Sequence, residues 1–325
     1  MKVALCLYGY IGTLKGKTDD FSKKTDESST GDLVLDLSHK HFKKHILDKN
    51  DVDVFIHSWE VDKQDEIKRL YEPKSSHFEK QIVFPDEPIL DEWKKANVGI
   101  ADPNTPEGYE KSKKRLQAHL SRWYGTGMSV SLKKDYEEKN DFKYDMVMIS
   151  RFDVCWMNDV IFNKFDPKYF WIPRVTMEKN TRTWYGWPFE TPEINDYWCF
   201  SNSAFIDDFS YMFNYIEKYV KPGYFPMWGG ISSHFLSVCH LIHMGLISVE
   251  SLKHKRPDIE NKVKFAFDFG IDGEPVTEMD DFTLVRFQYA KDLGIEVQSV
   301  ADWKKYIHQE RSILGPIYEE KRYEW

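Results

Sequence analysis

The sequence lacks several features that mark particular protein classes. It has only 4 cysteines in 325 residues. None forms a Cys-x-x-Cys pair, which argues against a zinc knuckle or a thioredoxin-type centre. No segment reaches the ~18 consecutive apolar residues of a membrane span. The apolar run that starts at Val3 ends at Gly9, too soon for a secretory signal. We therefore expect reduced, buried thiols in a cytoplasmic protein with no membrane span.

Basic residues are not in excess either. Lys and Arg number 45 against 53 Asp and Glu, a net charge of −8, which argues against a nucleic-acid partner. Aromatic residues, in contrast, are frequent at 16%. They fill cores, and they also form the platforms on which bases and sugar rings stack.

The order of apolar segments favours an α/β fold with a mostly parallel sheet. The pattern predicts strands at residues 3–8, 51–59, 82–84 and 144–149, with helices at 33–47, 63–70, 107–123 and 129–139. Gly125 and Gly127 are expected to separate the last two helices, and the stretch 85–106, with four prolines, is expected to be irregular. Such alternation is typical of a sheet flanked by helices. Further along, we expect short strands at 170–172 and 196–201 and helices at 204–219 and 232–244. No clear linker divides the chain, so one sheet-centred unit is expected.

The most informative stretch is YDMVMISRFDVCW at residues 144–156, in which an apolar strand leads into Arg151 and Asp153. Ligands of open α/β sheets bind outside the carboxyl ends of the strands. A guanidinium and a carboxylate there suit a metal-bridged diphosphate, with Arg151 on phosphate or sugar oxygens and Asp153 on the cation. The alternative is a structural ion pair at a strand end.

Four segments, taken in order, carry a family resemblance: VALCLYGYIG, DVFIHSWE, YEPK and YDMVMISRFDV. Together they resemble GT-A-type, nucleotide-sugar-dependent glycosyltransferases of a group found in bacterial polysaccharide loci and large DNA viruses. The resemblance covers roughly residues 2–201. It implies a GT-A-like (Rossmann-like) single catalytic domain over 1–325, with a nucleotide-sugar-binding part at 1–156 and an acceptor-binding part and tail at 157–325. It also implies a UDP- or GDP-sugar donor, a glycan acceptor and, for a viral protein, the host cytoplasm.

The ends of the first two strands supply the remaining donor-site candidates. Tyr8, Gly9, Tyr10 and Gly12 form a turn in which the glycines permit close backbone approach to a ligand, although the segment is not a G-x-G-x-x-G fingerprint. A plain turn is the alternative. In the second strand, His57 and Trp59 share a face and could border a nucleobase. Alternatively, Trp59 caps the core and His57 bonds the backbone.

Metal binding rests on Asp153, because Arg151 stands where a D-x-D motif has its first carboxylate. One carboxylate with diphosphate oxygens and waters can hold Mn²⁺ or Mg²⁺. Arg151 could instead neutralise the diphosphate and reduce the need for metal.

An inverting transfer also needs a base for the acceptor hydroxyl. Asp196 is the first candidate, with Glu190 and Glu193 as neighbours that compete for the role. His234, which follows the segment Trp228-Gly229-Gly230, is the second candidate, and a core histidine is its alternative. Three aromatic residues are expected to border the acceptor groove or to pack among themselves: Trp184, Tyr185 and Trp187.

Two other functions stay open. A non-catalytic glycan-binding protein would need only the aromatic loops, and a sugar nucleotidyltransferase could use Lys15 and Lys17 after the first strand. The donor base and sugar, the acceptor, the stereochemistry and the oligomeric state are not readable from the sequence.

Overall fold

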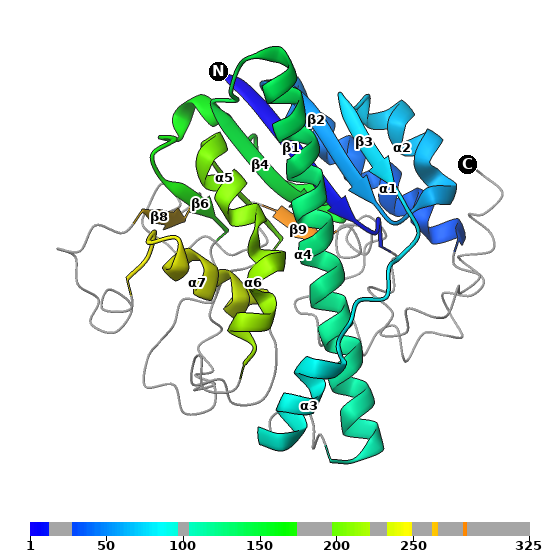
Figure 1. Cartoon of the computed structure of the whole chain (residues 1–325). Helices are drawn as coiled ribbons and strands as arrows, with labels where there is room; N and C mark the ends of the chain where they lie inside the picture. The colour runs from blue at the N-terminus through cyan, green and yellow to red at the C-terminus, as the bar shows by residue number, and fades with distance from the viewer. Residues whose placement is uncertain are drawn as a thin grey trace, which may run out of the picture.

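The computed structural model describes residues 1–12, 28–96, 104–173, 197–221, 233–248, 262–265 and 282–284, with backbone alone at 28–32, 234–235, 265 and 282–284. In these ranges a seven-stranded sheet has the order β3-β2-β1-β4-β7-β6-β8 (Figure 1). Its strands are β1 (Lys2–Gly9), β2 (Asp51–Ser58), β3 (Ser75–Phe78), β4 (Met146–Arg151), β6 (Phe170–Ile172), β7 (Trp198–Ser201) and β8 (Val263–Phe265). The pair β5 (Val154–Trp156) and β9 (Phe282–Leu284) forms a second, small sheet.

The first four strands are parallel, and the antiparallel β7 joins them to β6 and β8. The helices are α1 (Ser28–His45), α2 (Gln64–Tyr71), α3 (Glu87–Ala96), α4 (Pro106–Asn140), α5 (Ser203–Ser210), α6 (Met212–Tyr219) and α7 (Ser233–His243). Single turns of 3₁₀ helix occur at Leu47–Lys49, Val61–Lys63 and Phe162–Lys164. The expected α/β class and the mostly parallel sheet between helices are confirmed.

Both faces of the sheet are covered by helices, so its strands are apolar on both sides. In β1, Cys6 and Tyr8 pack with α4, α5, α6 and α7 on one face. Leu5 and Leu7 pack with α1 and α2 on the other. This alternation follows from the period of two along a strand.

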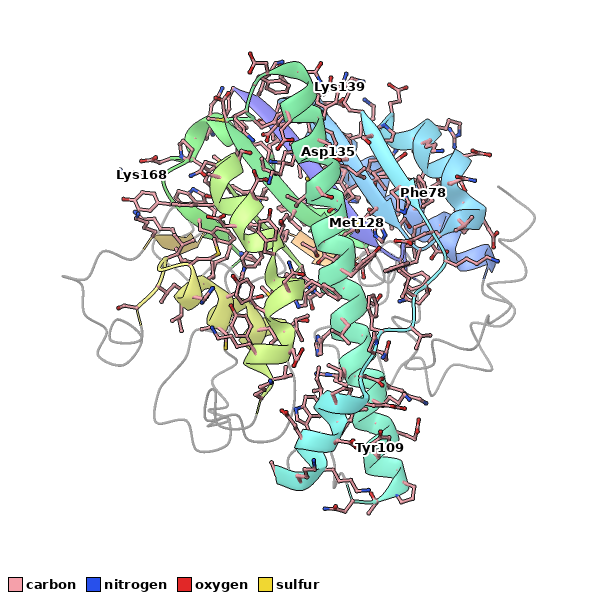
Figure 2. All side chains as sticks on the ribbon, viewed as in Figure 1. Phe78, Tyr109, Met128, Asp135, Lys139 and Lys168 are labelled. Atoms are coloured by element: carbon pink, nitrogen blue, oxygen red, sulfur yellow. The ribbon has the colours of Figure 1, made fainter. Side chains whose placement is uncertain are left out.

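The long helix α4 crosses β1, β2 and β3, and its first half extends past the sheet beside α3 (Figure 2, from Met128 to Tyr109). Thr105 caps α4 by accepting the Gly108 N–H at 3.1 Å, and Pro106 opens it, where a proline costs no hydrogen bond. The two helices expected at 107–123 and 129–139 are therefore one.

Other sequence-based expectations also need correction. The third strand is Ser75–Phe78, whereas residues 82–84 are not a strand. The helix α3 lies in a stretch that the sequence indicated as irregular, and the helix expected at 204–219 is divided into α5 and α6. The strand at 170–172 is confirmed, and the one expected at 196–201 is observed from Trp198.

A buried ionic cluster joins α4 to α5. Lys133, which is 0% exposed, donates to Glu137 Oε2 at 3.0 Å, Ser203 Oγ at 2.7 Å and Asp207 Oδ1 at 2.5 Å. Burying an ammonium is costly unless such partners surround it. The cluster thus fixes α5 against the sheet-covering part of α4.

A buried histidine of α7, His240, is hydrogen-bonded to α6 and to α5. His240 Nδ1 accepts from the Tyr219 hydroxyl at 2.7 Å, and its Nε2 donates to the Asp208 carbonyl at 3.1 Å. Burial lowers the pKa of His240 to about 4, so the ring stays uncharged at neutral pH.

The four cysteines are buried free thiols, as expected. Burial raises the pKa of Cys6 to about 12, which makes this thiol unreactive. None of the helices in the described ranges is long and apolar enough to cross a membrane.

Candidate functional site

The sheet register brings the three predicted strand ends together. Tyr8 is paired with His57 on one side and with Arg151 on the other, and Gly9 lies beside Ser58. All three strands run in the same direction, so their carboxyl ends meet at one edge. This is the edge at which ligands of α/β sheets bind.

A glycine turn leaves β1 at this edge. Gly9 and Gly12 have φ values of +89° and +91°, in the left-handed region that side chains rarely enter. A Cβ on Gly12 would lie 3.7 Å from the Cβ of Asp153, so the turn runs directly against the end of β4. Tyr10, between the glycines, keeps 37% of its surface exposed.

Arg151 and Asp153 form a two-pronged ion pair. Arg151 Nε donates to Asp153 Oδ1 at 2.8 Å, and its Nη2 donates to Oδ2 at 2.5 Å. Their side chains are only 12% and 17% exposed, and the guanidinium lies 4.9 Å from the centre of the Tyr197 ring. The guanidinium has five N–H donors, and Asp153 accepts hydrogen bonds from two of them.

His57 and Trp59 are packed between the sheet and α4. His57 Nε2 donates to Glu79 Oε1 at 3.1 Å, and burial lowers the pKa of the ring more than the carboxylate raises it. Trp59 is 4% exposed and stacks on Tyr124, with centroids 5.6 Å apart. A nucleobase could stack on Trp59 only after Tyr124 moved, so the predicted base contact stays a prediction.

Gly125 of α4 allows this close packing. A Cβ there would lie 3.0 Å from His57 Nδ1 and 3.7 Å from the backbone nitrogen of Gly9. The helix therefore touches the carboxyl ends of β1 and β2 at a position where only glycine fits without displacement.

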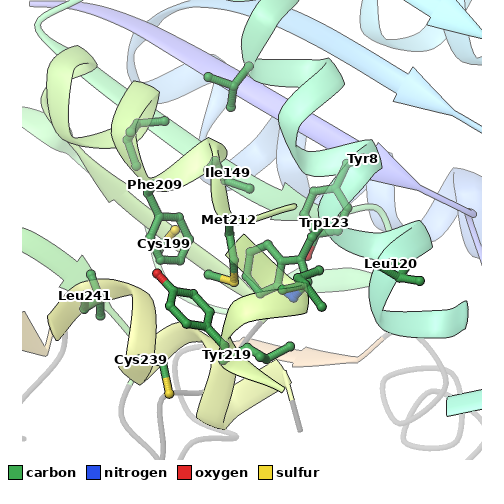
Figure 3. Packing of buried hydrophobic residues seen from close by; sticks show 14 of the residues in the cluster. Tyr8, Leu120, Trp123, Ile149, Cys199, Phe209, Met212, Tyr219, Cys239 and Leu241 are labelled. Atoms are coloured by element: carbon green, nitrogen blue, oxygen red, sulfur yellow. The ribbon is translucent and has the colours of Figure 1, made fainter. Parts of the chain in front are cut away.

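A small cavity lies behind Tyr8, among the apolar side chains shown in Figure 3. Its volume of about 20 Å³ has room for about one water molecule. Its lining residues are Tyr8, Arg122, Trp123, Ile149, Phe170, Ile172, Trp198, Cys199, Phe209 and Ser237. The buried Arg122 guanidinium lies 5.4 Å from the Tyr8 ring centre and 4.4 Å from that of Trp123. Arg122 thus places a positive charge beneath the edge.

The described residues contain no group of three or more His, Cys, Asp or Glu arranged to hold a metal ion. Asp153, the predicted metal ligand, lies against the glycine turn, and both its oxygens accept from Arg151. Mg²⁺ sites often use one or two carboxylates together with substrate phosphates. Asp153 therefore fits a divalent cation if a bound diphosphate supplies further oxygen ligands.

The acceptor-side candidates fall largely outside the described residues. Asp196, its neighbours Glu190 and Glu193, and the aromatic residues at 184–187 lie there, as does the segment 228–230. The backbone of His234 is in the first turn of α7, but its side chain is not described. These roles remain predictions.

No protein-family model and no curated protein matches the sequence. Among solved structures, mouse xyloside xylosyltransferase 1 in its apo form is similar over 75% of this chain and 82% of its own, at 11% identity and a TM-score of 0.36. A mutant of a protein described only as a transferase is similar over 79% and 92%, at 8% identity and a TM-score of 0.31. At these values neither likeness says what this chain does.

Three residues at the edge were not singled out from the sequence. Glu60 ends the DVFIHSWE segment, and its position just past a strand end could have identified it as a site candidate. Arg122 and Glu79 gave no such signal, because their place depends on how α4 and the β3 region pack against the sheet.

Proposed function

We propose that the chain is a glycosyltransferase that moves a hexose or pentose from a nucleotide diphosphate sugar to a glycan. A UDP- or GDP-sugar is the expected donor. The observation that carries the proposal is the meeting of the positive-φ glycine turn with the Arg151–Asp153 pair at the carboxyl edge of a parallel sheet. A guanidinium beside a glycine turn is chemistry suited to a diphosphate.

The reaction needs a stabilised leaving group. A sugar that leaves its diphosphate passes through an oxocarbenium-like state while negative charge collects on the departing phosphate. Arg151, turned from Asp153 toward the phosphate, would supply two parallel hydrogen bonds and a positive charge. Arg122 lies behind Tyr8 and adds positive potential to the same edge.

A divalent cation, Mn²⁺ or Mg²⁺, would add charge neutralisation at the diphosphate when bound, with Asp153 as its ligand from the protein. In that state Asp153 would exchange its hydrogen bonds from Arg151 for the cation. Arg151 would hydrogen-bond the phosphate oxygens.

For an inverting reaction, Asp196 or His234 is proposed as the base that takes the proton of the acceptor hydroxyl. Asp196 directly precedes Tyr197, whose ring centre lies 4.9 Å from the Arg151 guanidinium. His234 is in the first turn of α7, the helix that contributes Ser237 to the cavity behind Tyr8. A retaining reaction would not use them in this role.

The test is donor turnover. Purified protein is incubated with a panel of UDP- and GDP-sugars and Mn²⁺, and release of the nucleoside diphosphate is measured. We expect release with at least one donor and its loss in Arg151→Met. A protein that binds glycans but turns over no donor would be a glycan-binding module instead. Pyrophosphate release from a nucleoside triphosphate and a sugar phosphate would indicate a nucleotidyltransferase.

A further inference from the structure

Glu60 occupies the side of the glycine turn opposite Asp153. It follows β2, whose last residue Ser58 is paired with Gly9. The Ile11 backbone N–H hydrogen-bonds the Glu60 carboxylate, while the next residue, Gly12, lies against Asp153. Consecutive Cα atoms are about 3.8 Å apart. The two carboxylates therefore flank the same short piece of backbone.

The Glu60 backbone is fixed by hydrogen bonds from the strand ends. Ser58 Oγ donates to the Gly9 carbonyl at 2.9 Å and accepts from the Glu60 N–H at 3.1 Å. This hydroxyl links the exit of β1 to the exit of β2. The Glu60 backbone is thus fixed beside the turn, and the Ile11 N–H directs its carboxylate to the turn.

Within the described part of the chain, the Glu60 carboxylate can accept more hydrogen bonds than the one from the Ile11 N–H. Burial is the main factor that raises the pKa of Glu60. The Ile11 N–H lowers this pKa, and the negative charge of Asp62 raises it. The Tyr10 ring, 37% exposed, is close enough that burial and Glu60 together raise its pKa to about 12. A carboxylate can accept several hydrogen bonds, and the Ile11 amide supplies one.

We propose that the Glu60 carboxylate accepts hydrogen bonds from the ribose hydroxyls of the bound nucleotide. This inference rests on the proposed function and names how that site holds the nucleoside part of its donor. An acidic side chain just past the second strand of a β-α-β unit can bond ribose hydroxyls while the turn after the first strand meets the phosphates. Here the turn and the carboxylate have that relation.

Other ligand chemistry fits Glu60 less well. A phosphate would be repelled by the carboxylate, whereas a sugar diol presents two donors to it. The arrangement places the positive Arg151 on the β4 side of the turn and the negative Glu60 on the β2 side. A nucleoside diphosphate has the matching order of phosphates and ribose.

The experiment compares ribose with deoxyribose ligands by calorimetry. UDP and GDP, with their 2′-deoxy and 3′-deoxy analogues, are titrated into the wild type, Glu60→Gln and Asp62→Asn. The glutamine keeps the acceptor for Ile11 and nearly the same volume. Asp62→Asn removes an equal charge from an exposed neighbour. Thermal unfolding verifies that all three proteins are folded.

We expect the wild type and Asp62→Asn to bind the ribonucleotide roughly tenfold more tightly than a deoxy analogue, as for a hydrogen bond to a charged group. Glu60→Gln should weaken ribonucleotide binding and reduce this discrimination to about twofold. Equal binding of ribose and deoxyribose ligands by the wild type would overturn the inference and leave the proposed function intact. An equal loss for both ligands in Glu60→Gln would also overturn it. Binding of no nucleoside diphosphate at all would overturn the proposed function itself.

Discussion

Replacing Asp153 by asparagine should have opposite effects with and without a divalent cation. In the structure the Asp153 carboxylate occupies the Nε and Nη2 donors of Arg151, so a diphosphate must compete with it. Asp153→Asn removes that competition and the repulsion between carboxylate and phosphate. Without metal, the variant should therefore bind a nucleoside diphosphate more tightly than the wild type. With Mn²⁺ the wild type should gain affinity and the variant should gain little.

The exposure of the Arg151–Asp153 ion pair determines how much the nucleotide affinity should change. Exposed ion pairs contribute about 0.2–1 kcal/mol, and removing one partner of a fully buried pair costs about 3–5 kcal/mol. At 12% and 17% exposure, this pair lies between the two cases, and about 2 kcal/mol is a reasonable value. That energy corresponds to roughly thirtyfold in the dissociation constant. The same change should lower the melting temperature, because it leaves the Arg151 charge without its carboxylate.

The assay is calorimetric titration of GDP and UDP in EDTA and in Mn²⁺. Asp48→Asn serves as a control, because it removes a carboxylate from an exposed pair with Lys43. It should leave both affinities unchanged. Weaker binding by Asp153→Asn than by the wild type in EDTA would refute the reasoning that Arg151 is held back by its partner.

Three further predictions concern packing and protonation. Gly125→Ala, whose Cβ would lie 3.0 Å from His57 Nδ1, should cost about 1–3 kcal/mol in urea unfolding and also weaken nucleotide binding. Lys133→Met should cost about 3–5 kcal/mol by urea unfolding, because it removes the buried ammonium that Glu137 and Asp207 share, whereas Lys134→Met, which loses only an exposed hydrogen bond to the Tyr211 hydroxyl, should stay within about 0.5 kcal/mol. His240, whose pKa is lowered to about 4, binds a proton more readily in the unfolded chain. Stability should therefore fall by about 2 kcal/mol from pH 7 to pH 5, and this part of the slope should be missing in His240→Asn.

Strongly apolar segments made much of the sheet predictable. The runs at β1, β2 and β4 are continuous enough to indicate strands buried on both faces, and their order implies parallel pairing. β3 was missed because Ser75–Phe78 is mostly polar and lies at the sheet edge. The antiparallel β7, inserted between β4 and β6, could not be inferred from chain order.

Proline and glycine misled the helix prediction for physical reasons. Pro88 and Pro106 lie in the first turns of α3 and α4, where the missing N–H costs nothing, but in the sequence they suggested irregular chain. Gly125 and Gly127 suggested a break. Inside α4 they instead allow the helix to approach His57 and the Ser210 carbonyl.

The location of the candidate site followed from the sequence, but its internal contacts did not. Strand ends place Tyr8, His57 and Arg151 at one edge once the sheet is parallel. Whether Arg151 and Asp153 face a ligand or each other depends on side-chain rotamers and on the path of the Gly12 turn. These are tertiary properties that no local pattern encodes.

The central claim is that this edge binds a diphosphate through Arg151. Its most direct test is calorimetry of UDP and GDP against the matching monophosphates, in Mn²⁺, with the wild type and Arg151→Gln. The account predicts that one diphosphate binds at least tenfold more tightly than its monophosphate, by charge-assisted hydrogen bonds from the guanidinium, and that Arg151→Gln loses this preference. Equal affinity for mono- and diphosphates in the wild type, or no binding of either, would contradict it.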